Sequence, residues 1–308
     1  MRRLGLIRRI FLSLLVIYLS VSLIAGIGLA ELNLHPPRLH LLPAARLIAA
    51  TEAKNKTRVE DVNIRALDNA TLRGWYARPA RDNGNVVVLL HGVADNREGV
   101  AGYAQIFLSH GYRVLLPDSR AHGESGGALA TYGLLEADDI HRWVTWLYAH
   151  DAPHCVFGLG ESMGAALLLQ SLAAEPRFCA VVAESSFSTF RSEAYDRTGF
   201  FIGLGPWFGR SLGRLPIEVA LLYTWLRYHL DFTHANPQDA VASSRVPVLL
   251  IHGMNDRNIL PSHSQQLATV GANHAELWLV PHADHTGAWS TAPEQFETRV
   301  LEWFRTHD

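Results

Sequence analysis

The sequence predicts an α/β fold, in which a mostly parallel sheet of about eight strands carries helices on both faces. Three observations lead to this prediction. After residue 85, short apolar runs alternate with helical patterns, which is typical of parallel strands joined by helices. Some runs, such as Val86–Leu90, are apolar at every position, as strands buried on both faces require. The apolar run 156–159 leads through Gly-Glu-Ser-Met-Gly at residues 160–164 into a helix-forming run, which indicates a strand, a sharp turn and a helix.

The first thirty residues have the pattern of a membrane segment. Residues 1–9 contain four arginines, and residues 10–30 contain no charged residue. A helix of that length rises about 30 Å, the thickness of the hydrocarbon core of a bilayer. We therefore expect residues 1–32 to form a single-pass membrane anchor through residues 10–30, with the arginines in the cytoplasm and the rest of the chain outside. Secretion after signal-peptide cleavage near Ala30 is the alternative, although the apolar run is long for a signal peptide.

The rest of the chain divides into a tether and a domain in two parts. Residues 33–57 contain Pro36, Pro37 and Pro43 and are predicted to form the tether. The domain is expected over residues 58–186 and 243–308. Its predicted strands are 59–67, 71–78, 86–90, 113–117, 156–159, 179–183, 246–252 and 276–280. Its predicted helices are 103–110, 134–148, the run after the Gly-x-Ser-x-Gly motif, 262–270 and 293–306.

Residues 187–242 interrupt this alternation, because they contain no clear strand. Glycines and prolines between Gly203 and Pro216 are followed by the apolar run 217–230, which holds Tyr223 and Trp225. Helical, apolar insertions flanked by glycines are typical of segments that cover binding sites. We predict a helical lid inserted after the sixth strand, in which Tyr223 and Trp225 contact the substrate. The alternative is a helix that simply packs onto the core.

Ser162 is the candidate nucleophile. The strand-turn-helix context forces it into a strained backbone conformation, and a Cβ at Gly160 or Gly164 would collide with the neighbouring strand or helix. The turn holds the hydroxyl at the positive end of a helix, where a developing oxyanion is stabilised. The alternative is a glycine-rich turn that carries an idle serine.

A serine nucleophile needs a base and an orienting acid, and both are expected at the carboxyl ends of later strands. Asp256 follows the strand at 246–252, and His285 follows the strand at 276–280. The chain order Ser162, Asp256, His285 is that of a nucleophile-elbow catalytic triad. His282 is the competing base, and we prefer His285 because its longer loop gives it more reach. Glu184, at the end of the strand after the elbow helix, is the competing acid.

Two backbone amides are expected to hold the oxyanion. We assign them to Met163, directly after the nucleophile, and to Val93, in the loop after residues 86–90. His91 and Gly92 of that loop are predicted to contact the substrate.

A second glycine-rich loop, residues 118–125, holds Asp118 and His122. We interpret both as groups that satisfy loop backbone atoms and shape the floor of the pocket, rather than as catalytic residues.

Composition excludes several classes of function. The net charge is −2, and no basic stripe follows residue 10, so nucleic acid is not an expected partner. His282 and His285 lack a third metal ligand, so we predict no metal site, and the proposed chemistry needs no cofactor.

The two cysteines, Cys155 and Cys179, begin adjacent predicted strands, close enough for a disulfide in an exported domain. The alternative is that they are two small buried side chains. The sequence leaves the oligomeric state open.

The chain resembles the α/β-hydrolase superfamily, in the broad branch that includes serine aminopeptidase-like hydrolases and monoacylglycerol lipases. The motifs that carry the resemblance are His91-Gly92 with Asp95-Asn96-Arg97, the loop 118–125, the motif 160–164, and residues 252–256 with His285-Thr286-Gly287. They span about residue 60 to the C-terminus. The resemblance places the nucleophile on Ser162, the acid on Asp256 and the base on His285. The sequence departs from the family pattern at Ala121, where glycine is usual, and at Ala165, where the family often has another glycine.

The residues and the resemblance together predict a membrane-tethered serine hydrolase that cleaves carboxylic esters through an acyl-enzyme. A small-molecule ester or lipid-like substrate is favoured because the predicted lid is apolar and offers no obvious carboxylate to hold a peptide amine. An exopeptidase or amidase of the serine aminopeptidase type is the first alternative. A non-catalytic binding protein on the same fold is the second, although the complete Ser, Asp and His set argues against it.

Overall fold

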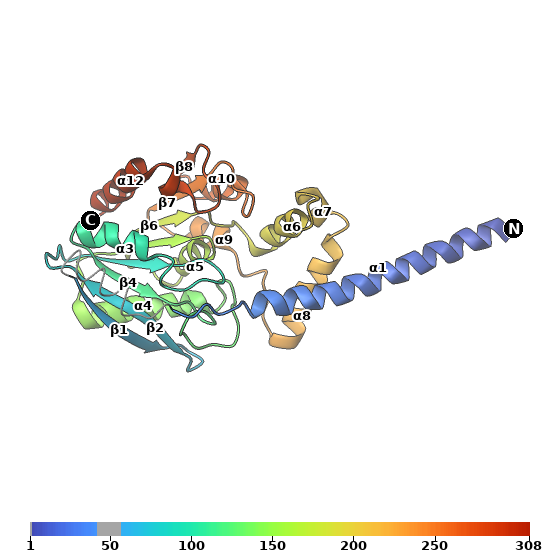
Figure 1. Cartoon of the computed structure of the whole chain (residues 1–308), viewed down its shortest axis with the longest axis horizontal. Helices are drawn as coiled ribbons and strands as arrows, with labels where there is room; N and C mark the ends of the chain where they lie inside the picture. The colour runs from blue at the N-terminus through green and yellow to red at the C-terminus, as the bar shows by residue number, and fades with distance from the viewer. Residues whose placement is uncertain (1, 42–56) are drawn as a thin grey trace. The chain divides into compact units, whose positions relative to one another are not determined.

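A computed structural model describes residues 2–41 and 57–308. The predicted tether therefore lies largely outside the described residues, which resume at the edge of the sheet. Figure 1 shows the sheet and the helices around it. The strands are β1 (Arg58–Arg65), β2 (Thr71–Arg78), β3 (Val86–Leu90), β4 (Arg113–Pro117), β5 (Val156–Glu161), β6 (Phe178–Glu184), β7 (Val248–Gly253) and β8 (Ala275–Val280). The helices are α1 (Arg2–Leu34), α3 (Ala101–Ser109), α4 (Glu136–Asp151), α5 (Met163–Ser171), α6 (Phe190–Phe201), α7 (Pro206–Arg210), α8 (Arg214–Tyr228), α9 (Pro237–Ser243), α10 (Pro261–Val270), α11 (Ala288–Thr291) and α12 (Pro293–Thr306).

The eight strands form one sheet in the order β1-β2-β4-β3-β5-β6-β7-β8. The β1-β2 and β2-β4 pairs are antiparallel, and every pair from β4 to β8 is parallel. The predicted mostly parallel sheet of about eight strands is confirmed. Because the parallel strands all end at the same edge, the loops after β3, β5, β6, β7 and β8 meet there.

Alternate residues of the strands face different helical layers. Trp75, Ala77 and Phe157 belong to the buried cluster that also includes side chains of α3 and α12, and the rings of Phe107 and Phe304 lie 5.6 Å apart within it. Tyr76, between the first two, instead meets Trp146 of α4. This alternation follows from the period of two in a strand, and it puts helices on both faces as predicted.

Element boundaries differ from the predicted ones by a few residues. The largest shift is in α4, which was predicted at 134–148 and runs from Glu136 to Asp151. The Glu136 carboxylate accepts the amides of Thr131 and Gly133 and so stabilises the turn ahead of the helix. At its other end the helix continues to Asp151 and stops before Ala152, which has a left-handed conformation.

The chain forms two compact units. One contains residues 35–193 and 233–308, and we call it the hydrolase body; the other contains residues 1–34 and 194–232, and we call it the N-terminal unit. The insert between β6 and β7 is helical and holds α6 to α9. Of these helices, α9 packs against α5 and α10 in the hydrolase body. Helices α7 and α8 belong to the N-terminal unit together with α1.

Cys155 and Cys179 are joined by a disulfide, with their Cα atoms 5.8 Å apart. Cys155 precedes β5 and Cys179 lies in β6, its neighbour in the sheet. The sequence left this pairing open, and the structure contains it because neighbouring parallel strands bring the two Cα atoms within bridging distance.

Candidate active site

Ser162 occupies a sharp turn between β5 and α5. Its φ and ψ angles are 52° and −119°, a strained conformation for a residue with a side chain. The turn is compact because two glycines allow it. A Cβ on Gly160 would lie 2.5 Å from the carbonyl oxygen of Gly164, and a Cβ on Gly164 would collide with the carbonyl of Leu90. The predicted need for glycine at both positions is confirmed.

The structure brings Ser162, His285 and Asp256 into one hydrogen-bonded chain. The hydroxyl of Ser162 donates to Nε2 of His285 at 2.9 Å, and Nδ1 of His285 donates to Oδ2 of Asp256 at 2.7 Å. Ser162 is 8% exposed, and the Asp256 side chain is fully buried. In this order the imidazole can take a proton from the hydroxyl while the carboxylate stabilises the resulting imidazolium.

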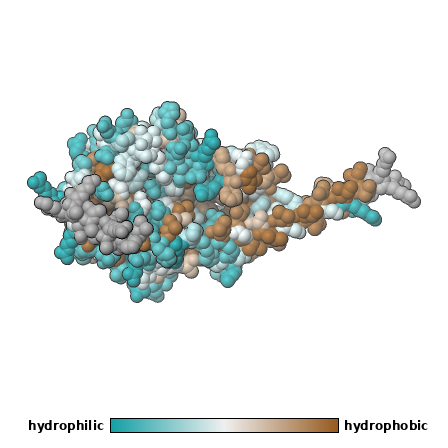
Figure 2. All heavy atoms as spheres, in the orientation of Figure 1, coloured by the Kyte–Doolittle hydropathy of each residue, from teal (hydrophilic) through white to brown (hydrophobic). Residues whose placement is uncertain are grey.

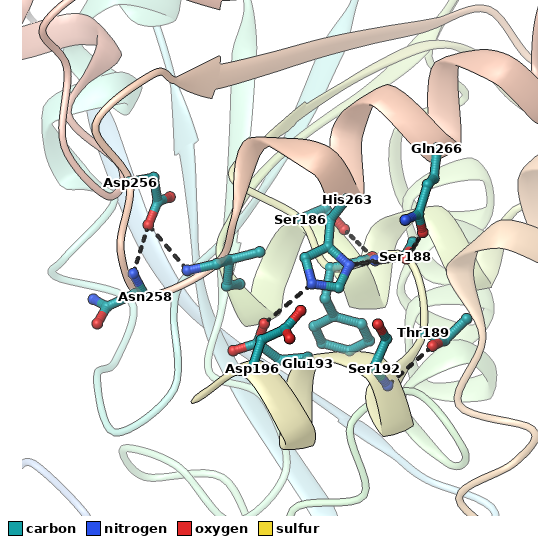
Figure 3. Close-up of polar contacts among 12 residues, drawn as sticks. Ser186, Ser188, Thr189, Ser192, Glu193, Asp196, Asp256, Asn258, His263 and Gln266 are labelled. Atoms are coloured by element: carbon teal, nitrogen blue, oxygen red, sulfur yellow. Dashed lines mark hydrogen bonds and ion pairs between the residues drawn. The ribbon is translucent and has the colours of Figure 1, made fainter. Parts of the chain in front are cut away.

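Asp256 is held as a carboxylate by groups of its own loop. Its Oδ1 accepts the amides of Asn258 at 2.9 Å and Ile259 at 3.0 Å, and the contact with Asn258 is visible in Figure 3. Nε2 of His252 lies 3.3 Å from Oδ2. Burial acts to raise the pKa of Asp256, but hydrogen bonds from His252, His285 and Ile259 outweigh it and hold the pKa below its usual range. Asp256 is therefore ionised when His285 accepts the proton from Ser162.

The alternative base and acid do not take part in this chain of contacts. His282 is exposed, with a φ angle of 64°, on the same loop as His285. Glu184 is buried, where its Oε1 accepts the amide of Ala288 at 2.9 Å and its Oε2 accepts the Tyr103 hydroxyl at 2.9 Å. Among the residues in the described ranges, no three His, Cys, Asp or Glu side chains gather as a metal site would require.

The loop after β3 passes beside the nucleophile. A Cβ on Gly92 would lie 3.7 Å from the Cβ of Ser162, and Val93 is the next residue of the loop. The amide of Met163 starts α5 and has no acceptor within the helix. Their role as an oxyanion hole stays a prediction.

The His91 ring forms hydrogen bonds with the backbone around this loop. Its Nδ1 donates to the Gly92 carbonyl at 2.8 Å, and its Nε2 accepts the Ser119 amide at 3.0 Å. Burial, followed by the neighbouring His122, lowers the pKa of His91 to about 4, so the ring is neutral. Both ring nitrogens are thus engaged with the backbone, and contact of His91 with a substrate stays a prediction.

Asp118 organises the second glycine-rich loop, as predicted. Its carboxylate accepts the amides of Arg97 and Glu124, both at 2.8 Å, and the Arg97 guanidinium lies 3.0 Å from it. His122 donates to the Arg120 carbonyl at 2.9 Å. Ala121 adopts a φ angle of 60°, the left-handed conformation that explains why glycine is common at this position in the family.

Sequence reasoning missed a pair of carboxyl groups next to the elbow, the half-buried Glu161 and the buried Glu184. Glu161 and Glu184 end the adjacent strands β5 and β6 in register, and the Tyr103 hydroxyl lies 3.3 Å from Glu161 and 2.9 Å from Glu184. Burial, then the charges of Glu184 and Asp95, raises the pKa of Glu161 to about 8. The signal was present, since two neighbouring parallel strands each end in glutamate.

A second polar cluster, where the segment after β6 meets α10, also has the residue types of a triad (Figure 3). The Ser188 hydroxyl lies 2.8 Å from Nδ1 of His263, the ring nitrogen opposite to the one that Ser162 contacts on His285. The Ser188 amide donates to Nδ1 of His263 at 3.1 Å, and Nε2 of His263 lies 3.5 Å from Glu193. The Ser188 hydroxyl donates to Oε1 of Gln266 at 2.8 Å. All three triad-type residues are buried, so the cluster ties the base of the insert to α10 rather than presenting a nucleophile.

The comparisons with known proteins agree with this architecture. Residues 87–299 match the α/β hydrolase family, and the chain belongs to that family. The uncharacterised protein YqkD of Bacillus subtilis is 27% identical over 239 residues, covering 75% of this chain and 74% of the relative.

Solved structures show the same fold. The Pyrococcus furiosus esterase Pf2001 superposes with a TM-score of 0.69 at 25% identity, covering 88% of this chain and 98% of the esterase. The acylaminoacyl peptidase of Pyrococcus horikoshii superposes with a TM-score of 0.61 at 18% identity, covering 82% of this chain and 42% of the peptidase.

Proposed function

We propose that this α/β hydrolase is a serine hydrolase that cleaves carboxylic esters. The observation that carries the proposal is the continuous contact from the Ser162 hydroxyl through His285 to the buried Asp256. Ser162 attacks the carbonyl carbon while His285 takes its proton, and the amides of Met163 and Val93 stabilise the oxyanion. His285 then protonates the leaving alcohol. Water activated by His285 hydrolyses the acyl-enzyme and releases the acid.

An ester is favoured over a peptide for two reasons. The run 217–230 of the insert is mostly apolar, which suits an acyl chain rather than a charged amine. The similar Pyrococcus furiosus structure is that of an esterase. In this proposal Tyr223 and Trp225 remain candidate substrate contacts, with Gly92 lining the nucleophile.

We also propose that the hydrolase body works outside the cytoplasmic membrane, tethered by α1. A stretch of α1, Gly5–Leu34, is long and apolar enough to cross a bilayer. The arginines before Ile10 favour a cytoplasmic N-terminus. The Cys155–Cys179 disulfide supports an oxidising compartment for the hydrolase body.

The test of the catalytic proposal is labelling of the full chain by a fluorophosphonate probe, which reacts with activated serines. We expect labelling of the wild type and of Ser186→Ala, a nearby buried serine variant, and no labelling of Ser162→Ala. A series of p-nitrophenyl esters of rising chain length, beside the matching anilides, then measures acyl preference and distinguishes esterase from amidase. A folded wild-type chain that neither labels nor hydrolyses any ester would refute the proposal in favour of a non-catalytic binding protein.

A further inference from the structure

The N-terminal helix does more than precede the hydrolase body, because it packs along α8 of the insert. The two helices approach so closely at Gly26 that a Cβ there would lie 2.5 Å from the Pro216 carbonyl oxygen and 2.6 Å from the Val219 side chain. On α1, Ser22, Gly26 and Ala30 are buried, and their spacing of four places them on one face of the helix. The helix therefore presents a face of small residues to α8.

Polar contacts extend this packing toward both ends of α8. At one end, the hydroxyls of Tyr223 and Tyr228 donate to Oε1 of Glu31 at 2.6 and 2.8 Å. Near the other end, the Tyr18 hydroxyl donates to the Leu212 carbonyl at 2.9 Å. The insert thus accompanies α1 from residue 18 to residue 31.

The length of α1 decides where this packed region lies if the helix spans a bilayer. Charges at Arg8 and Arg9 put the start of the hydrocarbon segment near Ile10. From Ile10 to Val21, where every side chain is exposed, the helix rises only about 18 Å. The hydrocarbon core is about 30 Å thick, so residues after Val21 must lie within it as well. The residues after Val21 are the ones that pack against α8.

The surface of the insert fits that location. Large apolar side chains that are more than half exposed gather at the end of α6, on α7 and α8, and in the turns between these helices: Phe201, Leu204, Trp207, Leu212, Leu222 and Leu226. Figure 2 shows apolar residues along the N-terminal helix and on this insert. A water-facing surface rarely gathers so many, whereas a lipid-facing one requires them, and tryptophan is enriched at the membrane interface.

The charged side chains of α7 and α8 have partners inside the same unit. Arg210 makes two 2.7 Å hydrogen bonds to Asp196. Arg214 lies 3.9 Å from Glu218, which also accepts the Tyr195 hydroxyl. The Arg227 guanidinium lies over the Tyr228 ring, 5.0 Å from its centre. Paired charges are what a poorly hydrated environment requires.

We propose that α1, α7 and α8 enter the bilayer as one body, with the exposed apolar side chains of the insert against the acyl chains of the outer leaflet. The occupant of this apolar surface is lipid, since the surface is continuous with the helix that spans the membrane. Cleavage near Ala30 would remove Ser22, Gly26 and Ala30 from α8, so the proposal also requires α1 to be retained.

The test places an environment-sensitive fluorophore at single introduced cysteines in the full chain, reconstituted in phosphatidylcholine and phosphatidylglycerol vesicles that contain brominated acyl chains. The native cysteines are bridged and do not react under non-reducing conditions. Labels at Phe201→Cys, Trp207→Cys and Leu226→Cys report on the insert. Ile17→Cys, on the exposed part of α1, is the membrane control. Leu67→Cys, an exposed leucine between β1 and β2, is the water control.

We expect the insert labels to shift to the blue and to lose fluorescence as the Ile17 label does, while the Leu67 label does neither. Insert labels that behave like Leu67 while Ile17 is quenched would overturn the proposal, leaving α1 as an anchor only. A blue shift without quenching, dependent on the protein-to-lipid ratio, would overturn it in favour of a second copy of the chain. An unquenched Ile17 label would show that α1 does not span. All these readouts are independent of Ser162, so they stand apart from the catalytic proposal.

Discussion

The hydrolase body and the N-terminal unit differ in which side chains they bury and which they expose. At the edge of the sheet, the hydrolase body buries polar groups and satisfies them one by one, as Asp256 shows with two amides and two imidazoles. The N-terminal unit instead exposes large apolar side chains and pairs the charges of α7 and α8. The difference teaches that separate sets of residues determine the two properties. A few polar contacts define the candidate active site, and the exposed apolar side chains define the environment that the N-terminal unit fits.

The largest effect is expected at His285 in the hydrolase body. His285→Ala removes the base that contacts Ser162 and should lower kcat by about 10⁵–10⁶-fold. His282→Ala, an exposed histidine of the same loop, should leave kcat nearly unchanged. Ester hydrolysis by both variants gives the comparison. Equal losses would mean that the loop, rather than the base, matters.

The next effect is expected at Asp256. Asp256→Asn keeps the size of the side chain but removes the charge that orients His285, and should lower kcat by about 10⁴-fold with little change in KM. Asp284→Asn, at an exposed position on the loop of His285, is the matched control. If Asp256→Asn retained wild-type kcat, the acid would have to lie elsewhere, and Glu184 would be the first candidate.

A smaller effect is expected in the N-terminal unit at Gly26. Gly26→Val inserts a side chain into the contact with Pro216 and Val219 and should destabilise the packing of α1 on α8 by about 1–3 kcal/mol. Gly28→Val adds the same side chain two residues along, where an added Cβ meets no atom within 4 Å. Resistance of residues 194–232 to limited proteolysis in detergent micelles measures the difference. Equal resistance in the two variants would contradict the close contact.

The most gradual effect is a pH dependence set by Glu161. Because burial raises its pKa to about 8, the folded chain keeps a proton that the unfolded chain releases above its ordinary value of 4.5. The stability from this group is therefore present below about pH 4.5 and is lost as pH rises to about 8, with a slope of at most about 1.4 kcal/mol per pH unit.

Glu161→Gln should flatten that part of the profile, and Glu276→Gln, at an exposed position on β8, should not. Denaturant unfolding between pH 4.5 and 9 measures both. A wild-type profile that is already flat would show that Glu161 is ionised in the folded protein.

Local patterns carried most of the fold prediction. The predicted strands Val86–Leu90 and Arg113–Pro117 coincide with β3 and β4, because a strand buried on both faces is apolar over most of its length. The motif around Ser162 was recognisable because a glycine such as Gly160 is required by steric contacts with residues only a few positions away. Asp256 and His285 were placed at strand ends by the same logic, and their catalytic role stays a prediction.

What the sequence by itself determined is everything that depends on near neighbours and on periodicity: the alternation of strands and helices, the elbow at Ser162, and the long apolar helix before residue 35. Only the tertiary structure decided which distant groups meet. It joined Cys155 to Cys179, set Glu161 beside Glu184, and packed Gly26 against α8. The physical reason is that these contacts depend on strand order and helix packing, which many sequences share and no single stretch of residues specifies.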